Sequence, residues 1–392
     1  MELSAEWFRD MRFGVFVHWG LYSVAAKGEW QMLVERWSRE EYEEAFLHQF
    51  NPDKECVKEW VAAAKSAGAE YMVFTTRHHD GFSLYDSKAS IGNFTSVNSP
   101  AKHDFVADFV KEVREAGMKV GLYYSLADWR IHSHSKGELI TENMDALRTQ
   151  ANEQIRELLT NYGKIDILWY DGPFGYDEDG ILWGKEWPTW NPVELNAMVR
   201  QLQPGIAINN RSGTPEDFGT PEQHIIAESG GRMWEACMTM NDSWGYHRWD
   251  DHWKSAADLI NNIITCGVGG GSYLLNIGPK ADGSVPTESK ERLAAIGAWR
   301  KSYGDVLKAI TESRPNSGYP VVRNSDTMFV FQRNWPGSTL RVMNVPWKLS
   351  QAWLVKSGKP VTMTQQGDFV SFSGMPDEPE DPYCTVIAAK ID

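Results

Sequence analysis

The chain has 392 residues, of which 42% are hydrophobic and 23% are charged, as is ordinary for a globular protein. This length allows one large core and a smaller second domain. The formal net charge of -14 argues against nucleic acid as a partner, because nucleic-acid binding normally needs a basic surface.

The cysteines lack the spacing of a zinc site, and the N-terminus lacks the apolar core of a signal segment. The four cysteines are scattered along the sequence without the paired spacing of a zinc site, so we expect reduced, buried thiols; they are Cys56, Cys237, Cys266 and Cys384. The N-terminus has no apolar signal core, and no run of 18 apolar residues could span a membrane. We expect a cytoplasmic protein with no membrane partner, or a periplasmic or secreted one if a signal segment has been removed.

Seven apolar runs, rich in β-branched and aromatic residues, read as buried strands in chain order. They cover residues 12–20, 71–82, 119–129, 165–173, 205–211, 224–231 and 272–279. Amphipathic stretches between them predict helices over residues 56–68, 103–117, 142–163 and 255–268. This alternation favours an α/β fold with a closed (β/α)8-like barrel of the TIM type. Because only seven strands are visible, we expect the barrel to be irregular or one strand to be hidden.

The pattern changes after about residue 313. Residues 319–374 hold short alternating strands with turn residues between them, which is typical of an antiparallel β-sandwich. We therefore expect a barrel domain over residues 1–312 and a C-terminal β-sandwich over residues 313–392. The sandwich either stabilises the barrel or binds glycan, and in the second case Trp335, Trp347 and Trp353 are the candidate contacts.

Polar residues stand where successive predicted strands end. In a β/α barrel these ends meet at one mouth, where active sites lie. In chain order they are His18, Trp19, His78, His79, Asp80, Tyr123, Asp171, Asn210 and Arg211. One such residue alone would be uninformative, but together they predict a functional site.

Asp171 ends an apolar run directly before a Gly-Pro turn. Its side chain can cap that turn, or it can serve as a reactive carboxylate at the barrel mouth. With a second carboxylate about 5–5.5 Å away, it could act as the nucleophile of retaining glycoside hydrolysis. Spacing alone does not choose among the five candidates for that second group, which are Glu216, Asp217, Glu222, Glu228 and Glu235.

The cluster His78-His79-Asp80 allows a metal site or hydrogen bonds to a polyhydroxylated ligand. The rest of a metal ligand set is not apparent, because the first predicted strand carries only His18. His132 and His134 do form an H-x-H pair, but in a polar loop where we expect them to be solvated. Neutral imidazoles both donate and accept hydrogen bonds, which favours the second alternative. We expect no metal and no cofactor.

The strand-end residues lie in sequence blocks that resemble the retaining α-L-fucosidases of glycoside hydrolase family 29. The blocks are RFGVFVHWGLYS, GEWQ, TTRHHDGFSLYDS, GLYYSLADW, ILWYDG, DFGTPE, WEACMTMNDSWGY and LLNIGPKADGSVP, in the order of the family. The resemblance implies a barrel followed by a β-sandwich, with Asp171 as the nucleophile. It also implies fucose contacts by His18, Glu29, Trp30, His78, His79, Tyr123, Trp169 and Arg211. Arg77 stands where many members have lysine.

The resemblance also ranks the candidates for the acid/base. DFGTPE resembles the block that carries this residue in one major subgroup, which makes Glu222 the first choice. Glu216 is second, because another subgroup places the residue in a different loop. Glu235 is third, since the alternative role of its block is to shape the floor of the pocket.

The resemblance implies an exo-acting enzyme that removes terminal α-L-fucose from fucosylated oligosaccharides or glycoconjugates. Asp171 would form a covalent fucosyl-enzyme, and Glu222 would protonate the leaving oxygen and then activate water. Trp30 and Trp169 would form an apolar wall for the fucose methyl group. Two alternatives are a retaining hydrolase for a close relative of fucose, such as an α-L-galactoside, and a carbohydrate-binding barrel without activity. Residues 172–190, which include Trp183, Trp187 and Trp190, would line the leaving-group side or pack on the surface.

Overall fold

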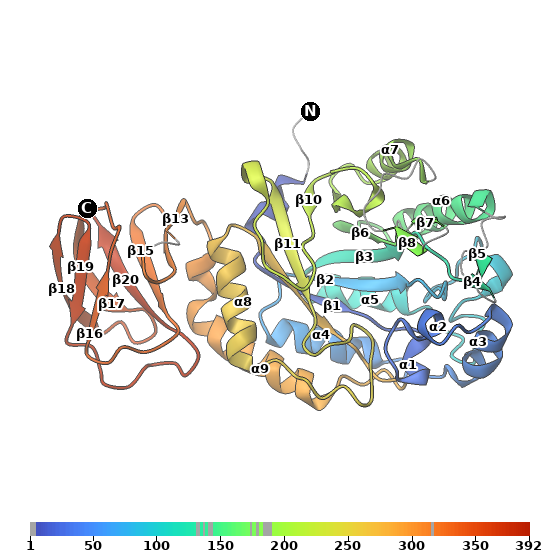
Figure 1. Ribbon diagram of the computed structural model, residues 1–392, viewed down its shortest axis with the longest axis horizontal. Coiled ribbons are helices and arrows are strands. Elements are labelled where there is room, and N and C mark those ends of the chain that lie inside the picture. The colour runs from blue at the N-terminus through green and yellow to red at the C-terminus, as the bar shows by residue number, and fades with distance from the viewer. Residues whose placement is uncertain are drawn as a thin grey trace.

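The computed structural model describes residues 5–130, 134–135, 138–139, 144–172, 175–177, 180–182, 190–314 and 317–392. His132, Trp183 and Trp187 lie outside the described residues, and only the backbone of His134 is described. Figure 1 shows two parts, a barrel that extends from the blue to the light-orange segments and an antiparallel sheet, orange to red, at the C-terminal end. In the described part of the chain, no helix is long and apolar enough to cross a membrane.

The barrel is a sheet of eight parallel strands, which confirms the expected α/β barrel. Its spatial order is β10-β11-β12-β1-β2-β3-β6-β9. The strands are β1 (Phe13–Val17), β2 (Tyr71–Arg77), β3 (Lys119–Ser125), β6 (Ile167–Asp171), β9 (Ala207–Ile208), β10 (Phe218–Gly219), β11 (Met233–Met238) and β12 (Ser272–Ile277). The edge strands β9 and β10 are only two residues long, and a single parallel bridge between Asn209 and Phe218 nearly closes the barrel.

One predicted strand is wrong. Residues 224–231 form a loop and a short 3-10 turn, whereas the strand at this place in the barrel is β11, directly after them. The paired isoleucines at 225 and 226 resemble a strand, but Ile226 is 63% exposed. The strand β11 is buried along its whole length, but the glutamate near its centre interrupts the apolar pattern from which a buried strand is predicted.

Helices cover the barrel unevenly, as Figure 1 shows. They are α1 (Tyr22–Ala25), α2 (Gln31–Val34), α3 (Arg39–Phe46), α4 (Cys56–Ser66), α5 (Phe105–Glu115), α6 (Met144–Asn161), α7 (Pro192–Leu202), α8 (Ala256–Val268) and α9 (Thr287–Tyr303). The four helices predicted from amphipathic patterns correspond to α4, α5, α6 and α8. Between β9 and β11, all of which the structure describes, no α-helix crosses the outside of the barrel, so the expected irregularity is real.

Short elements complete the barrel. Two small antiparallel pairs are β4 (His134–Ser135) with β5 (Glu138–Leu139) and β7 (Gly175–Asp177) with β8 (Gly180–Leu182). The 3-10 helices are η1 (Glu6–Asp10), η2 (Leu47–Gln49), η3 (Ile91–Asn93), η5 (Asn210–Ser212), η6 (Ser229–Gly231) and η7 (Gly304–Leu307). Helix starts follow from local chemistry, since Asp104 accepts the Ala107 N–H to cap α5, and Ser255 with Asp258 forms a capping box on α8.

The C-terminal part is an eight-stranded antiparallel sheet that curls into a sandwich around its own core. Its order is β13-β14-β15-β20-β17-β18-β19-β16. The strands are β13 (Glu312–Arg314), β14 (Val321–Arg323), β15 (Thr327–Gln332), β16 (Thr339–Val342), β17 (Leu349–Leu354), β18 (Pro360–Gln366), β19 (Phe369–Ser373) and β20 (Thr385–Ile391). The proposed domain boundary after residue 312 falls inside β13 and stays a prediction.

The sheet packs on the barrel side that carries α8 and α9 (Figure 1). Phe331 and Val386 of the sheet belong to the same buried cluster as the barrel helices, and the Trp299 indole donates a 3.0 Å hydrogen bond to the carbonyl of Cys384. Trp347 is buried, and Trp335 packs partly buried against the same sandwich core. These contacts support a stabilising role for the sandwich.

Candidate active site

The predicted site residues converge at the carboxyl ends of the barrel strands. His18 follows β1, His78 and His79 lie just after β2, and Asp171 ends β6. They line a pocket with an empty volume of about 390 Å³. Its wall consists of Phe16, His18, Trp30, His78, His79, Trp169, Asp171, Arg211, Glu222 and Trp244. Eight of these ten residues were expected from the sequence, while the expected Glu29 and Tyr123 are buried next to the wall rather than in it.

Both carboxylate oxygens of Asp171 are held by donors. The hydroxyl of Tyr123 donates to Oδ2 at 3.0 Å, and the guanidinium of Arg211 donates to Oδ1 at 3.1 Å. Burial opposes ionisation of Asp171, but Arg211 and His79 outweigh it and lower the pKa of this carboxyl below its usual value. Asp171 therefore presents a fixed, charged carboxylate to the pocket.

The turn after Asp171 depends on glycine. Gly172 has a φ of +63°, and a β-carbon there would lie 2.9 Å from the Ser125 hydroxyl and 3.0 Å from Nδ1 of His79. A larger residue would therefore strain the backbone and push against the histidine beside Asp171. The turn and the site are thus built from the same residues.

Arg211 joins two carboxylates in the pocket. Its Nη2 lies 2.8 Å from Oε2 of Glu222, while its Nη1 binds Asp171. Thr220 fixes the guanidinium from behind, because its hydroxyl accepts from Nε at 2.9 Å and its carbonyl from Nη2 at 3.2 Å. Glu222 is 40% exposed, so it lies at the open side of the pocket, whereas the Asp171 side chain is 15% exposed.

Glu216 and Asp217 do not line this pocket. Both pair with Arg200 of α7, at 2.7 Å and 2.9 Å, and Glu216 also accepts hydrogen bonds from Asn196 and Thr214. Their carboxylates are committed to holding α7 on the barrel. The second choice for the acid/base therefore has a structural role in this structure.

The other two carboxylates also lie outside the pocket wall. Glu228 packs against the backbone at Gly219. Glu235 is fully buried inside the barrel, beneath Trp169, whose indole N–H it accepts at 2.9 Å. Of the five candidates, Glu222 is the one that the structure places in the pocket with Asp171.

The pocket histidines are neutral near pH 7. Burial lowers the pKa of His18 to about 3 and that of His79 to about 4, and it lowers the pKa of His78 well below the usual value. Each neutral ring has one donor and one acceptor nitrogen. The pocket can therefore bind several hydroxyl groups without adding positive charge near Arg211.

Neighbouring side chains determine which nitrogen of two rings carries the proton. Ser125 uses its hydroxyl hydrogen on the carbonyl of Ala127, so at 2.7 Å it accepts from Nδ1 of His79. Asn276 uses its amide on the carbonyl of Trp244, so at 2.8 Å its oxygen accepts from Nδ1 of His18. In both rings Nε2 is then the acceptor nitrogen.

Glu29 lies behind the pocket wall. Its carboxylate accepts a 2.8 Å hydrogen bond from the N–H of Gly245, next to the pocket residue Trp244. Burial raises the pKa of Glu29, although backbone hydrogen bonds partly offset this. Glu29 thus fixes the loop that carries Trp244.

Phe16, Trp244, Ser125 and Asn276 were not identified as site residues from the sequence. Phe16 precedes His18 by two positions and so faces the same side of β1, which is the signal that could have found it. Trp244 lies within a recognised block, but its position depends on the loop fold. Phe16 and Trp244 meet in an edge-to-face arrangement with ring centroids 5.9 Å apart, and the centroids of Phe16 and Trp169 are 5.1 Å apart.

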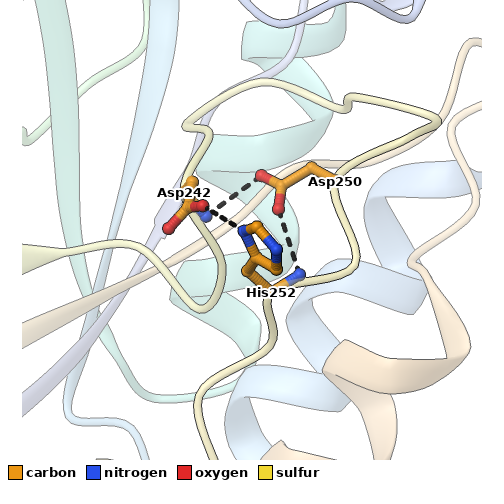
Figure 2. A group of neighbouring side chains, drawn as sticks. All are labelled: Asp242, Asp250 and His252. Carbon is orange, nitrogen blue, oxygen red and sulfur yellow. Dashed lines mark hydrogen bonds and ion pairs between the residues drawn. The ribbon is translucent and has the colours of Figure 1, made fainter.

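One group of side chains in the described part of the chain has the spacing of metal ligands. Figure 2 shows Asp242, Asp250 and His252, which lie outside the pocket wall and offer one ligand atom each within 4.8 Å of one another. Asp250 accepts the N–H of Asp242 at 3.0 Å, and Nδ1 of His252 lies 2.8 Å from Asp242. These contacts join the two ends of the loop that carries Trp244.

Comparison with known proteins identifies the family. The family model of α-L-fucosidases matches residues 2–305. This chain belongs to the α-L-fucosidase family. Tissue α-L-fucosidase of Rattus norvegicus is 30% identical over 340 residues, which cover 77% of this chain and 69% of that protein.

Two solved structures of α-L-fucosidases resemble this chain over nearly its whole fold. α-L-Fucosidase isoenzyme 1 of Paenibacillus thiaminolyticus is 31% identical and covers 100% of this chain and 99% of its own, with a TM-score of 0.89. The second is a family 29 α-L-fucosidase of Bacteroides thetaiotaomicron, trapped as a covalent intermediate with 2-fluoro-fucosyl fluoride. It is 26% identical, the match covers 98% of this chain and 95% of that chain, and the TM-score is 0.85. The expected enzyme class, a retaining glycoside hydrolase for α-L-fucosides, is confirmed. The α-L-galactosidase and the inactive barrel are not favoured.

Proposed function

We propose that Asp171 is the nucleophile and Glu222 the acid/base in the removal of terminal α-L-fucose from fucosylated oligosaccharides or glycoconjugates. The observation that carries this proposal is the shared guanidinium of Arg211, which binds both carboxylates in the wall of one pocket. Two carboxylates beside one pocket are what double displacement at an anomeric carbon requires.

In the first step, an oxygen of Asp171 attacks the anomeric carbon from the face opposite the leaving group. The bond from this carbon to the leaving oxygen breaks, and Glu222 gives that oxygen its proton. In the second step, Glu222 takes a proton from water, the water oxygen attacks the same carbon, and Asp171 is released. Two inversions at one carbon give net retention.

Arg211 couples the two carboxylates before the reaction. In this structure it pairs with Glu222 as well as with Asp171, but a general acid must carry a proton. Sugar hydroxyls that accept from the guanidinium would take the place of Glu222. The acid would then be released towards the leaving oxygen, while Arg211 keeps Asp171 ionised.

The pocket chemistry also fits the sugar. The acceptor nitrogens of His18 and His79 suit ring hydroxyls, which can donate to them. Phe16, Trp169 and Trp244 form an apolar corner. Fucose carries a methyl group where L-galactose carries a hydroxymethyl group, and burying one such carbon contributes about 0.8 kcal/mol.

Azide rescue tests both assignments. Release of p-nitrophenol from the α-L-fucoside is measured for the wild type, Asp171→Ala and Glu222→Ala, and both variants should lose roughly 10²- to 10⁴-fold in rate. Azide should rescue Asp171→Ala with formation of the β-fucosyl azide, and Glu222→Ala with formation of the α-fucosyl azide. If Glu222→Ala keeps near-normal activity, the acid/base is another residue, and if Asp171→Ala does, the nucleophile is another residue.

A further inference from the structure

A carboxylate that the proposed mechanism does not use lies inside the barrel, beneath the pocket. Glu235 stands in the middle of β11 and is 0% exposed. Its Oε1 accepts the 2.9 Å hydrogen bond from the indole N–H of Trp169, and its Oε2 accepts from the hydroxyl of Tyr71. Glutamate is almost never buried so completely unless specific partners hold it.

Residues of neighbouring strands hold Tyr71 in place beside the Glu235 carboxylate. The Tyr71 hydroxyl also lies 2.7 Å from the hydroxyl of Ser272 on β12, which pairs directly with Glu235 in the sheet. Gly14 on β1 leaves room for the Tyr71 ring, because a β-carbon there would lie 2.4 Å from it. Four strands therefore contribute to holding one buried carboxylate.

Trp169 connects this carboxylate to the nucleophile. Trp169 and Asp171 are two residues apart on β6 and so face the same side of the strand. The indole stacks on the ring of Tyr123, with centroids 5.6 Å apart and planes at 18°, and the guanidinium of Arg211 lies 4.7 Å from the indole centroid. Tyr123 and Arg211 are the two side chains that donate to Asp171. A tilt of the indole would disturb both donors.

We infer that Glu235 is a positioning residue whose oxygen fixes the Trp169 indole and, through it, the alignment of Tyr123 and Arg211 on Asp171. This inference rests on the proposed role of Asp171. The hydrogen-bond acceptor matters here, not the charge. Because the hydroxyls of Tyr71 and Ser272 can reverse their hydrogen bonds, a protonated carboxyl group can donate to Tyr71 and still present one oxygen to Trp169.

Burial raises the pKa of Glu235 to about 7, so both protonation states occur near neutral pH. The titratable and charged groups nearest to it are Tyr71, Arg211, Cys237 and Cys266. The orientation of the indole should be the same in both states, because an acceptor oxygen is present in each.

Three variants test the inference with p-nitrophenyl α-L-fucoside as substrate. Glu235→Met keeps the side-chain length but removes the acceptor, and it should lower kcat/KM by roughly tenfold or more. Glu235→Gln keeps an acceptor oxygen and should stay within about threefold of the wild type. Tyr71→Phe removes the other hydrogen bond of the same carboxylate but leaves the acceptor for the indole, so it should lower kcat/KM less than Glu235→Met does.

A double-mutant cycle shows whether Glu235 acts through Trp169. Trp169→Phe removes the indole N–H, so adding Glu235→Met to it should cause little further loss of kcat/KM. If the fold-losses of kcat/KM in Trp169→Phe and Glu235→Met multiply in the double variant, the two residues act independently and the inference is wrong. Wild-type kcat/KM in Glu235→Met would also overturn it, as would equal losses in the Gln and Met variants, which would assign the role to charge.

Two provisions keep the test decisive. If Glu235→Met does not fold, Glu235→Asp, which withdraws the carboxylate from the indole, replaces it in the cycle. Asp171→Ala is measured in the same series. Retained activity in Asp171→Ala would refute the proposed nucleophile, whereas an inactive Asp171→Ala with an unimpaired Glu235→Met would refute only the positioning role.

Discussion

The phenolic hydroxyl of Tyr123 donates a 3.0 Å hydrogen bond to Oδ2 of Asp171, and Oδ1 of the same carboxylate accepts from Arg211. One neutral donor and one cation thus hold the two oxygens in place. Burial raises the pKa of Tyr123 well above its usual value, so the phenol keeps its proton at neutral pH. This arrangement orients Asp171 without neutralising it.

Tyr123→Phe should therefore lower kcat/KM for fucoside cleavage. A hydrogen bond to a charged group contributes about 1.5–3 kcal/mol, which corresponds to roughly a 10- to 100-fold loss. Tyr124→Phe is the matched control, because Tyr124 is the next residue of β3, faces away from the barrel interior and bonds to Gln154 at 2.8 Å. Equal kcat/KM values for the two variants would contradict the orienting role of Tyr123.

Arg211→Met should move the acid limb of the kcat/KM profile to higher pH. Arg211 lowers the pKa of Asp171, so removing the cation makes the carboxylate harder to ionise and activity is lost at a higher pH as the solution is acidified. The measurement is kcat/KM against pH. Arg200→Met controls for the loss of an arginine that also bridges two carboxylates, and its acid limb should coincide with that of the wild type. An unchanged acid limb in Arg211→Met would refute the electrostatic role.

Glu235 should make the folded state less stable as the pH rises. Its folded pKa of about 7 lies above the reference value of 4.5, so the folded state holds a proton that the unfolded state has released in this range. The associated stability is complete below about pH 4.5 and is lost as the pH rises through 7, by on the order of 2–3 kcal/mol. Denaturant unfolding from pH 4.5 to 8 should show this slope in the wild type relative to Glu235→Gln. Parallel curves would show that Glu235 titrates normally.

Trp244→Ala should weaken the preference for fucose over L-galactose. Trp244 and Phe16 form the apolar corner of the pocket, and one buried methyl group contributes about 0.8 kcal/mol, or roughly fourfold in rate. The measurement is the ratio of kcat/KM for the p-nitrophenyl glycosides of the two sugars. Trp249→Ala removes a 65% exposed indole from the same loop and should leave the ratio unchanged. If both variants keep the wild-type ratio, the methyl group lies elsewhere.

The sequence allowed the barrel and most of the pocket to be predicted, because strand ends carry a local signal. Asp171 could be found since a charge at the tip of an apolar run is unusual, and the histidines after β1 and β2 stand at equivalent positions. The strand β11 was missed for a physical reason. Glu235 interrupts its apolar pattern, and only the distant donors Tyr71 and Trp169 make burial of that carboxylate tolerable.

The choice among the five carboxylates also needed the tertiary structure. Glu216 and Glu222 are six residues apart in one polar segment, and spacing does not tell that one pairs with Arg200 and the other with Arg211. The resemblance to the family ranked Glu222 first, and the structure places it in the pocket. Phe16 could have been found from its position two residues before His18, but the position of Trp244 depends on how a long loop folds against β1, which no local pattern encodes.

Identification of the covalently labelled residue tests the central claim most directly. The protein is treated with 2-deoxy-2-fluoro-α-L-fucosyl fluoride, which slows the second step, then digested with a protease and analysed by mass spectrometry. The account predicts one fluorofucosyl group on Asp171, in a peptide that spans residues 165–172, and no label on Asp171→Ala. A label on another carboxylate, or none on an enzyme that cleaves fucosides, would contradict the assignment of Asp171 as the nucleophile.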